Sequence, residues 1–464
     1  MRMSVIGCGH LGATHAACMA SLGHEVIGVD IDEDKVSLLN SGKGWFHEPE
    51  LDPMLAECIE AGRLRFTTDF AEAAEFAAVH FLGVATPGHP DGSYDMSQLR
   101  AAVSSLVPRL RGDALIIGKS TVSPGTAAGL QLMIDDMLRP GPGPGPGPEP
   151  GPGHVEVAWN PEFLREGHAV ADTLRPDRIV AGAGSAAAVE TIRQIYRPQT
   201  DAGIPLLVTD LPTAELAKGA ANAFLAAKIS FINAMADICA ATGGDISALA
   251  DSLGLDPRIG KDFLRAGIGY SGACLPKDVR GLGAFAREIG AQNAATLLGA
   301  VDAVNSARIG QVVSLVTDAV ARIAASRVAV WGASFKAGTD DVRDSAPLLV
   351  AEQLRELGAA VTVYDPMSGG NALVACPELA YADSAIAAAT AADVLVVTAA
   401  WPEFAQADPA EVARVVGRKA VVDACQGIDV TAWGAAGWRV WSLTGVPAGR
   451  ARSAVPGYGR GGAR

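Results

Sequence analysis

Blocks of hydrophobic residues alternate with amphipathic stretches along the first part of the chain. Residues 3–30 have the pattern of a strand, a glycine turn, a helix and a second strand. Further apolar segments follow at 79–84, 114–120, 155–160 and 178–183, with helix-like stretches between them. Strands that alternate with helices are typical of βαβ units, so this region predicts a parallel sheet.

The pattern changes between Thr213 and about Thr242, where an alanine-rich segment runs without an internal helix breaker. This is longer than an ordinary helix of a globular protein. Helices of such length commonly bridge two domains or form a dimer interface. The sequence leaves both uses open.

A second α/β region begins near Ser326. Apolar strands are expected within "RVAVWGASF", "AAVTVYDP", "ADVLVVTAAW" and "KAVVDACQ". The first two run strand, helix, strand and end at an acid, Asp365, as the N-terminal pair ends at Asp30. The predicted fold class is therefore α/β, with two Rossmann-like parallel-sheet domains joined by a central long-helix domain.

One segment, 139–153, interrupts these patterns with proline at alternate positions and glycine between them. Proline excludes a helix and glycine offers no side chain to pack, so we expect a disordered insertion in a surface loop. The glycine- and arginine-rich end of the chain, 449–464, is expected to be a flexible tail.

Length and charge limit the function classes. A chain of 464 residues is too long for one ordinary core, which favours two or three domains. The formal net charge is −14 and no Lys/Arg cluster occurs, which argues against a nucleic-acid partner. Every long apolar stretch contains a charge or a proline, so we expect no membrane segment.

The seven cysteines are scattered and contain no CxxC pair. This pattern indicates reduced thiols in a cytoplasmic protein, without a disulfide framework or a metal site. The first strand begins at about Met3, which leaves no room for a signal peptide.

A glycine motif opens the chain. Gly7, Gly9 and Gly12 form GxGxxG directly after a strand and at a helix start, and Asp30 closes the next strand. Such glycines let backbone N–H groups approach a pyrophosphate, and the carboxylate accepts the ribose hydroxyls. The alternative is a tight turn without a ligand. Because Asp30 would repel a 2′-phosphate, the motif favours NAD over NADP.

Two further motifs carry pairs of polar residues. In "WNPEFLREG", Asn160 is expected as a helix N-cap, which places Glu162 and Glu166 one turn apart on a shared face. Lys218 and Asn222 are also four residues apart, on the alanine-rich helix, where they could hold a developing oxyanion. The alternatives are a solvated acidic face and a snorkelling lysine.

Cys274 differs from the other cysteines in its surroundings. In "GIGYSGACLPKD", residues 267–278, it follows a glycine-bearing run and precedes Lys277 and Asp278. Lys277 would favour the thiolate, which is the reactive form. A cysteine that only fills a core needs neither feature, and that is our interpretation of the other six.

With these motifs in order, the chain resembles the UDP-glucose/GDP-mannose 6-dehydrogenase family and most closely its UDP-glucose 6-dehydrogenase branch. The matching segments extend from the glycine turn to about residue 430. They are "VATPGHPDGSYD", "GKSTVSPGT", "NPEFLREG", "AELAKGAANAFLA", "DPRIG", "GYSGACLPKDV" and "SFKAGTDDVRDSAP".

The resemblance implies a reaction. The C6 alcohol of UDP-glucose would be oxidised by four electrons to UDP-glucuronate, with NAD as cofactor. Cys274 would form a thiohemiacetal with the aldehyde and then a thioester. Lys218 and Asn222 would stabilise the oxyanion, Glu162 would activate the hydrolytic water, and Asp278 would orient that water or move protons.

The resemblance also implies binding residues and domain limits. Cofactor contacts would be Gly7, Gly9, Gly12, Asp30, Lys35, Thr86, Thr121, Glu166, Lys277 and Arg343. Substrate contacts would be Glu162, Phe163, Leu164, Arg165, Glu166, Lys218, Asn222, Arg258, Phe263, Leu264, Arg265, Ala266, Gly267, Ser271 and Lys336. The domains would be 1–200 for NAD, 201–312 for dimerisation and the catalytic cysteine, and 313–448 for the UDP-sugar. Arg258 would reach the site of the other subunit in a homodimer.

Two positions depart from the family pattern. Ser271 stands where a glycine is usual, and Cys425-Gln426 where Arg-Asn is frequent. A serine would be strained at Ser271 if φ were positive there. The second departure leaves open the same chemistry on GDP-mannose or another nucleotide sugar. Two other classes are also open: a single-step hydroxy-acid dehydrogenase, which needs no thiol, and a non-catalytic nucleotide-binding regulator.

Overall fold

The computed structural model describes residues 1–139 and 152–443, which divide into two units. The first unit comprises Met1–Ala223 and Lys277–Thr296, and the second comprises Phe224–Pro276 and the residues from Leu297 onward. The greater part of the predicted insertion and the predicted tail lie outside the described residues. The three domain limits inferred from the sequence stay predictions.

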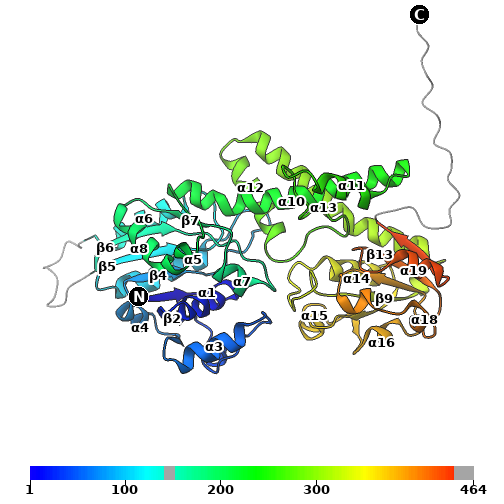
Figure 1. Ribbon diagram of the computed structural model, residues 1–464, viewed down its shortest axis with the longest axis horizontal. Helices are drawn as coiled ribbons and strands as arrows, with labels where there is room; N and C mark the ends of the chain where they lie inside the picture. Colours follow the sequence, from blue (N-terminus) through cyan, green and yellow to red (C-terminus); the bar gives the residue numbers. More distant parts are fainter. Residues whose placement is uncertain (140–151, 444–464) are drawn as a thin grey trace, which may run out of the picture. The chain divides into compact units, whose positions relative to one another are not determined.

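The first unit is built on an eight-stranded sheet with the order β3-β2-β1-β4-β5-β6-β7-β8 (Figure 1). The strands are β1 (Arg2–Ile6), β2 (Glu25–Val29), β3 (Leu64–Thr67), β4 (Val79–Leu82), β5 (Gly112–Gly118), β6 (Pro152–Trp159), β7 (Ile179–Gly182) and β8 (Leu206–Thr209). Neighbouring strands are parallel except β6 and β7, which pair antiparallel at Trp159 and Gly182. The sequence therefore predicted six of these strands and most of their directions, but not β3, β8 or this reversal.

Helices cover both faces of this sheet because successive strand residues point to opposite sides. Val5 packs with α1, whereas its neighbour Ile6 packs with α4 and α5. The helices are α1 (His10–Ser21), α2 (Glu33–Asn40), α3 (Leu51–Glu60), α4 (Phe70–Phe76), α5 (Ser97–Leu106), α6 (Thr126–Met137), α7 (Ala169–Leu174), α8 (Ala186–Ile195) and α9 (Arg197–Asp201).

The second unit contains a six-stranded parallel sheet with the order β11-β10-β9-β12-β13-β14. The strands are β9 (Arg327–Trp331), β10 (Ala360–Tyr364), β11 (Ala380–Tyr381), β12 (Val394–Val397), β13 (Ala420–Asp423) and β14 (Arg439–Ser442). Val330 and Trp331 again point to opposite cores. The shorter helices are α14 (Ala346–Glu356), α15 (Gly369–Ala375), α16 (Ala385–Ala389), α17 (Pro402–Ala405), α18 (Pro409–Val412) and α19 (Val430–Ala435).

The predicted long helix is confirmed as α10 (Leu211–Thr242), which continues from the first unit into the second. The remaining helices are α11 (Ile246–Gly254), α12 (Leu275–Glu288) and α13 (Gln292–Ala319). Both sheets have the strand order of the doubly wound nucleotide-binding fold, in which ligands bind beyond the carboxyl ends of the strands. The predicted fold class is thus confirmed.

The sequence expectation that the chain has no membrane segment stays a prediction. By length and composition alone α10 could cross a membrane, with a mean hydropathy of 1.5 over its most apolar window. Its polar residues are too few to lower the hydropathy of that window below the value of a membrane span. Several of them are nevertheless buried and bonded to other protein groups, including Lys218, Asn222 and Asn233. A core helix of a soluble protein passes the same test, so the finding assigns no membrane.

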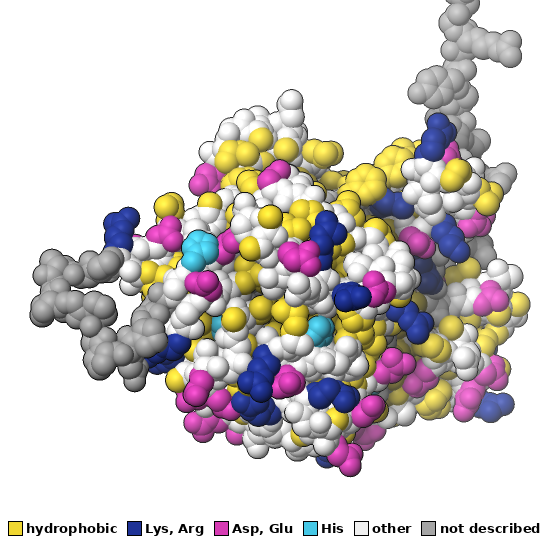
Figure 2. Space-filling view, turned by 60° about the vertical axis from the view of Figure 1, so that its left-hand side comes forward, with side chains coloured by type: hydrophobic (Ala, Val, Ile, Leu, Met, Phe, Trp, Pro, Cys, Tyr) yellow, Lys and Arg dark blue, Asp and Glu magenta, His cyan; other side chains and the backbone are white. Residues whose placement is uncertain are grey.

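Surface charges are mixed in sign. On the face drawn in Figure 2, Lys and Arg side chains are interspersed with Asp and Glu side chains. That face therefore shows no basic stripe of the kind that follows a nucleic-acid backbone.

Candidate active site

The glycine turn between β1 and α1 has the geometry that a dinucleotide needs. A Cβ at Gly12 would lie 1.7 Å from the carbonyl oxygen of Gly7, so glycine is required there for the turn to close. Gly7 has φ +88°, which side chains rarely adopt. A Cβ at Gly9, by contrast, would meet nothing within 4 Å. The turn is therefore closed on its protein side and open where a pyrophosphate would approach.

Asp30 follows β2 and faces this turn. Its carboxylate accepts hydrogen bonds from the N–H of Cys8 at 2.8 Å and from the N–H of Asp32 at 3.1 Å. The side chain is partly exposed, so oxygen lone pairs are available to ribose hydroxyls. Lys35 lies on α2, 4.8 Å from the centre of the Trp45 ring.

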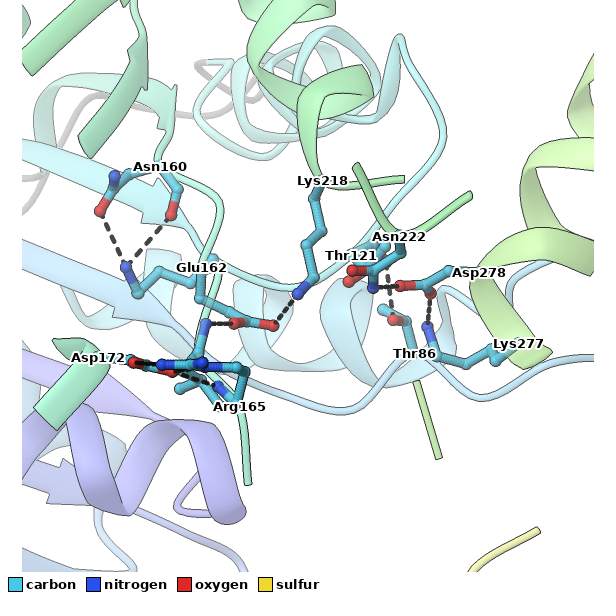
Figure 3. A network of polar contacts seen from close by, with 12 residues as sticks. Thr86, Thr121, Asn160, Glu162, Arg165, Asp172, Lys218, Asn222, Lys277 and Asp278 are labelled. Carbon is cyan, nitrogen blue, oxygen red and sulfur yellow. Dashed lines mark hydrogen bonds and ion pairs between the residues drawn. The ribbon is translucent and has the colours of Figure 1, made fainter. Parts of the chain in front are cut away.

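Thr86 and Thr121 meet at the carboxyl ends of β4 and β5. The Thr86 hydroxyl donates to the backbone oxygen of Thr121 at 2.7 Å (Figure 3). β4 lies next to β1 in the sheet, at the point where the strand order reverses. Doubly wound sheets bind their ligands at this reversal, so the two threonines lie in the expected region for the cofactor.

Glu162 and Lys218 form a largely buried ion pair. Lys218 Nζ lies 2.9 Å from Glu162 Oε1, and the side chains are 5% and 13% exposed respectively (Figure 3). Glu162 Oε2 accepts a hydrogen bond from the N–H of Leu164 at 2.7 Å. The pair places a carboxylate that could act as a base beside an ammonium that could stabilise an oxyanion.

The predicted helix start at Asn160 is wrong. Residues 160–165 form an irregular segment, and the next helix, α7, begins at Ala169. The Asn160 side chain cannot cap a helix because its Nδ2 donates to the carbonyl of Val180 at 2.7 Å and its Oδ1 accepts from Lys119 at 2.9 Å. Glu162 and Glu166 are therefore not one helical turn apart.

This irregular segment is held at its far end by Glu48. The Glu48 carboxylate is buried and accepts from the N–H groups of Gly167 at 2.8 Å and Ala169 at 2.7 Å. Within the segment, Arg165 pairs with Asp172 through two hydrogen bonds of 2.9 and 2.7 Å. The loop that carries Glu162 is thus fixed by polar contacts instead of helical hydrogen bonds.

A second polar group surrounds Asp278, in the first turn of α12. Its carboxylate accepts from Asn222 Nδ2 at 2.6 Å and lies 2.6 Å from Lys277 Nζ (Figure 3). The Tyr94 hydroxyl donates to the same carboxylate at 3.4 Å. Burial and then the charge of Asp278 raise the pKa of Tyr94, so its hydroxyl stays a proton donor.

Cys274 is exposed and directly precedes α12, which begins at Leu275. The N-terminus of a helix carries a partial positive charge that stabilises a thiolate. Five of the other cysteines are buried and Cys425 is half-buried. None of the seven, all within described residues, forms a disulfide. Cys274 is therefore the cysteine best placed to react.

Most of the remaining predicted contacts lie in the second unit. Gly267 donates its N–H to Asn233 Oδ1 at 2.8 Å, and Leu264 and Ala266 are buried. Phe263 has φ +64°. Arg258 is exposed and pairs with Asp256 at 2.6 Å.

Three more predicted contacts belong to the connection between β9 and α14. Lys336 and Arg343 lie in this connection, and Ser271 bonds to it. Ser271 Oγ donates to the carbonyl of Phe335 at 3.4 Å. Lys336 Nζ lies 5.5 Å from the Phe335 ring, and Arg343 pairs with Asp341 at 2.6 Å.

The two departures from the family pattern have structural answers. The positive φ at this point of the chain belongs to Gly272, at +88°, and not to Ser271, so the serine is not strained. Gln426 has φ +56° and donates from Nε2 to the carbonyl of Ala266 at 3.2 Å. The Arg265 guanidinium donates to the carbonyl of Gln426. Gln426 therefore supports the substrate segment predicted at 263–267.

The first unit brings together Glu162 with Lys218, and Asn222 with Lys277 and Asp278. Sequence reasoning missed the residues that hold these groups, namely Glu48, Tyr94, Lys119 and Tyr196. Lys119 had a signal, because it is a charged residue directly after the apolar strand "ALIIG". The others are single residues in loops or helices, and only the tertiary fold brings them to the site.

Comparison with known families matches the chain in three segments. These are the NAD binding domain of the UDP-glucose/GDP-mannose dehydrogenase family at 1–200, its central domain at 212–307 and its UDP binding domain at 329–430.

Among individual relatives, the UDP-glucose 6-dehydrogenase AglM of Haloferax volcanii is 41% identical over 88% of this chain and 93% of that protein. A UDP-glucose 6-dehydrogenase of Pseudomonas aeruginosa is 39% identical over 88% of this chain and 89% of that protein. The solved UDP-glucose dehydrogenase of Pyrobaculum islandicum has a TM-score of 0.85 and 32% identity, covering 96% of this chain and 98% of that one. A UDP-D-ManNAc dehydrogenase of Pyrococcus horikoshii has a TM-score of 0.82 and 25% identity, covering 96% and 99%.

Proposed function

The chain belongs to the UDP-glucose/GDP-mannose dehydrogenase family, and we propose that it oxidises the C6 alcohol of UDP-glucose to the carboxylate of UDP-glucuronate. It is an NAD-dependent oxidoreductase. The observation that carries the proposal is the buried Glu162–Lys218 pair in the unit that also holds the open glycine turn. The exposed Cys274 at the start of α12 supplies the nucleophile.

The residues of the first unit fit NAD. Gly9 leaves the approach to the α1 N-terminus open, and Asp30 has oxygen lone pairs for the ribose hydroxyls. Thr86 and Thr121 line the neighbouring strand ends. When bound, NAD supplies the hydride acceptor, and two NAD molecules are consumed for each sugar.

Lys218 and Asn222 act on the reacting oxygen in both oxidation steps. The alcohol loses a proton and a hydride to become an aldehyde. The Cys274 sulfur then adds to the aldehyde carbon and forms the C–S bond of a thiohemiacetal, whose loss of a second hydride and a proton leaves a thioester. An ammonium and an amide group stabilise the negative charge that develops on oxygen at each stage.

Glu162 serves the last step. Its carboxylate takes a proton from water, and the water oxygen bonds to the acyl carbon. The C–S bond breaks with its electron pair on the Cys274 sulfur, which regenerates the enzyme and releases the uronic acid. Asp278, held by Asn222 and Lys277, orients this water or carries the proton.

The assembly that we propose is a cytoplasmic homodimer. The part of α10 in the second unit supports it, since Phe224, Phe231 and Ile238 recur at seven-residue intervals and are 69%, 51% and 55% exposed. An apolar stripe of this spacing suits a helix–helix interface. In the dimer, Arg258 would reach the site of the other subunit. Light scattering of Phe231→Glu checks this proposal, and a dimeric variant would contradict it.

The reaction is tested by incubating the protein with UDP-glucose and NAD. We expect about two NADH per sugar, with the stoichiometry set by the four-electron oxidation. Cys274→Ala should lose the second oxidation, and Cys425→Ala, another cysteine of the second unit, is the matched control that should keep it. A wild-type product that stops at the aldehyde, or no turnover at all, would contradict the proposal.

A second candidate is the same chemistry on another nucleotide sugar. This candidate is supported by Gln426. The residue belongs to Cys425-Gln426, where the family frequently has Arg-Asn, and its side chain contacts the predicted substrate segment 263–267. A panel of UDP- and GDP-sugars decides between them by the ratio of kcat/KM values.

A further inference from the structure

Arg178 lies beside the segment that carries Glu162 because β7 runs against β6. The two strands pair antiparallel at Trp159 and Gly182, the last residue of each strand. Each residue beyond Trp159 therefore lies opposite an earlier residue of β7. Continued along the chain, this alignment places Phe163 opposite Arg178, the residue directly before β7. A parallel β7 would have placed Arg178 at the other edge of the sheet.

The Arg178 and Phe163 side chains contact each other there. The Arg178 Cζ lies over the Phe163 ring, 3.7 Å from its centre, and both residues are half-buried. The ring also packs against the buried core that contains Trp159 and Val180. Within the residues that the structure describes, no hydrogen bond or ion pair engages the Arg178 guanidinium. A partly desolvated guanidinium on an aromatic face is a cation–π contact of the stronger kind.

The segment that carries Glu162 is held at both ends by groups that have no role in the proposed reaction. At its start, the Asn160 side chain bonds to β7, and at its end the Glu48 carboxylate bonds to Gly167. In the middle, the Glu162 carboxylate pairs with Lys218 at 2.9 Å (Figure 3). That ion pair opens when Lys218 turns to the substrate oxygen. The middle of the segment then needs a support that the reaction does not use.

The stacked ring provides this support, since Phe163 directly follows Glu162. We propose that Arg178 is a positioning residue for thioester hydrolysis: it holds the Phe163 ring by stacking and so keeps the neighbouring carboxylate in place after its ion pair opens. This rests on the proposed function, in which Glu162 activates the hydrolytic water. Lys218 and Asn222 serve the oxidation steps from α10, a regular helix whose hydrogen bonds do not depend on the stack.

The test is a single turnover of the full-length enzyme, with NAD in excess over enzyme and enzyme in excess over UDP-glucose. NADH formation reports the two oxidation steps, and intact-protein mass reports the acyl group on Cys274. Arg178→Met keeps a long apolar side chain and removes the guanidinium, and Arg178→Lys is a second variant that keeps the charge. Arg65→Met is the matched control, because Arg65 lies 4.6 Å from the centre of the Phe76 ring but on β3, at the far end of the same sheet.

In Arg178→Met we expect hydrolysis to slow by about ten-fold, as the loss of a partly desolvated cation–π contact predicts, while both oxidation steps keep their rates. The acyl adduct on Cys274 should therefore accumulate. Arg178→Lys should recover part of the rate, because an ammonium also binds a ring face but does not stack on it. Arg65→Met should behave as the wild type.

A double-mutant cycle separates the stack from an independent effect of either residue. Phe163→Leu should also slow hydrolysis, and the double variant with Arg178→Met should be no slower than Phe163→Leu alone, because the contact is already lost. Losses that multiply in the double variant would overturn the proposal, since the two residues would then act separately.

An equal slowing of oxidation and hydrolysis in Arg178→Met would overturn it as well. A merely structural role lowers the fraction of active enzyme and so reduces every step by one factor. An unchanged hydrolysis rate would have the same consequence. All these results leave the wild-type reaction intact. Failure of the wild type to form NADH from UDP-glucose would instead contradict the proposed function, so the two failures are distinguishable.

Discussion

The two α/β units use one strand order for two different local chemistries. In each, a central strand leads into a glycine turn, and the next strand of the sheet ends at an acid, Asp30 or Asp365. In the first unit, α1 begins at His10, close after β1, so its N-terminus faces the turn. In the second, α14 begins only at Ala346, after the long connection 332–345 that contains Lys336 and Arg343.

The acids differ in how far their hydrogen-bonding capacity is used. Asp30 accepts two backbone N–H bonds and is partly exposed. Asp365 is buried and accepts from six donors, namely the N–H groups of Ala333, Ser334, Met367 and Ser368, the Ser334 hydroxyl and the Trp401 indole. Burial alone would raise the pKa of Asp365, but the backbone donors together lower it. The first acid is open to a ligand and the second is structural.

This difference teaches that strand order and an acid at a strand end do not define a dinucleotide site. A ribose needs lone pairs that the protein has not used, and a pyrophosphate needs a helix N-terminus next to a turn without side chains. The first unit provides both. The second offers side-chain cations on a long connection instead.

The largest expected effect is on the stability of the first unit, and it distinguishes Gly12 from Gly9 in the glycine turn. Gly12→Ala would place a methyl group 1.7 Å from the Gly7 carbonyl, and we expect a loss of at least about 4 kcal/mol in unfolding free energy. Gly9→Ala meets no protein atom within 4 Å, so it should fold normally and weaken NAD binding by about ten-fold or more. Chemical denaturation and NAD titration measure the two. If Gly9→Ala bound NAD with wild-type affinity, the open side of the turn at Gly9 would not be where the pyrophosphate approaches.

A smaller but still large effect is expected from Asp365→Ala. The change leaves six donors without their carboxylate, which should lower the stability of the second unit by about 3 kcal/mol. The midpoint of its unfolding transition measures this loss, while the KM for NAD should stay unchanged. An intact transition with a raised KM would break the comparison, because Asp365 would then be a ligand contact.

Asp30→Ala should weaken NAD binding and leave the stability of the fold nearly unchanged. Loss of a charged acceptor for the ribose should cost about 1.5–3 kcal/mol of NAD binding, or roughly a 10- to 150-fold rise in KM. Discrimination against NADP should weaken, because the repulsion of the 2′-phosphate is gone. The unfolding midpoint should change little. A large fall in stability with an unchanged KM would show that Asp30, like Asp365, is structural.

The sequence was sufficient for features that depend on local periodicity. The ten central strands, the long α10 and the glycine turn follow from apolar spacing and from glycine stereochemistry, whereas β3, β8, β11 and β14 were not predicted. The reversal at β7 and the irregular path from Asn160 to Gly167 did not follow, because they depend on distant partners. The local sequence around Asn160 resembles a helix cap, but its side-chain amide accepts a hydrogen bond from Lys119 and donates one to Val180. Likewise, Asp30 and Asp365 are indistinguishable by pattern, since the donors around Asp365 come from three separate segments.

The smallest expected effect comes from one of those donors. Trp401→Phe keeps an aromatic ring at this buried position, though a smaller one, and removes the indole N–H that donates to Asp365 at 3.1 Å. We expect a loss of about 1–2 kcal/mol in the second unit near neutral pH, because the bond is made to a charged acceptor.

The pH dependence of this loss sharpens the comparison between the acids. A carboxylate whose folded-state pKa is lowered stabilises the fold above its unfolded pKa, and that contribution disappears as the pH falls through the folded value. The difference between wild type and Trp401→Phe should therefore shrink on acidification, since a protonated carboxyl accepts a weaker bond. Trp438→Phe is the matched control, because its indole donates at 3.0 Å to the neutral carbonyl of Pro409. Its destabilisation should not vary with pH in the same range. Equal pH profiles for the two variants would mean that Asp365 is not held as an anion by its donors.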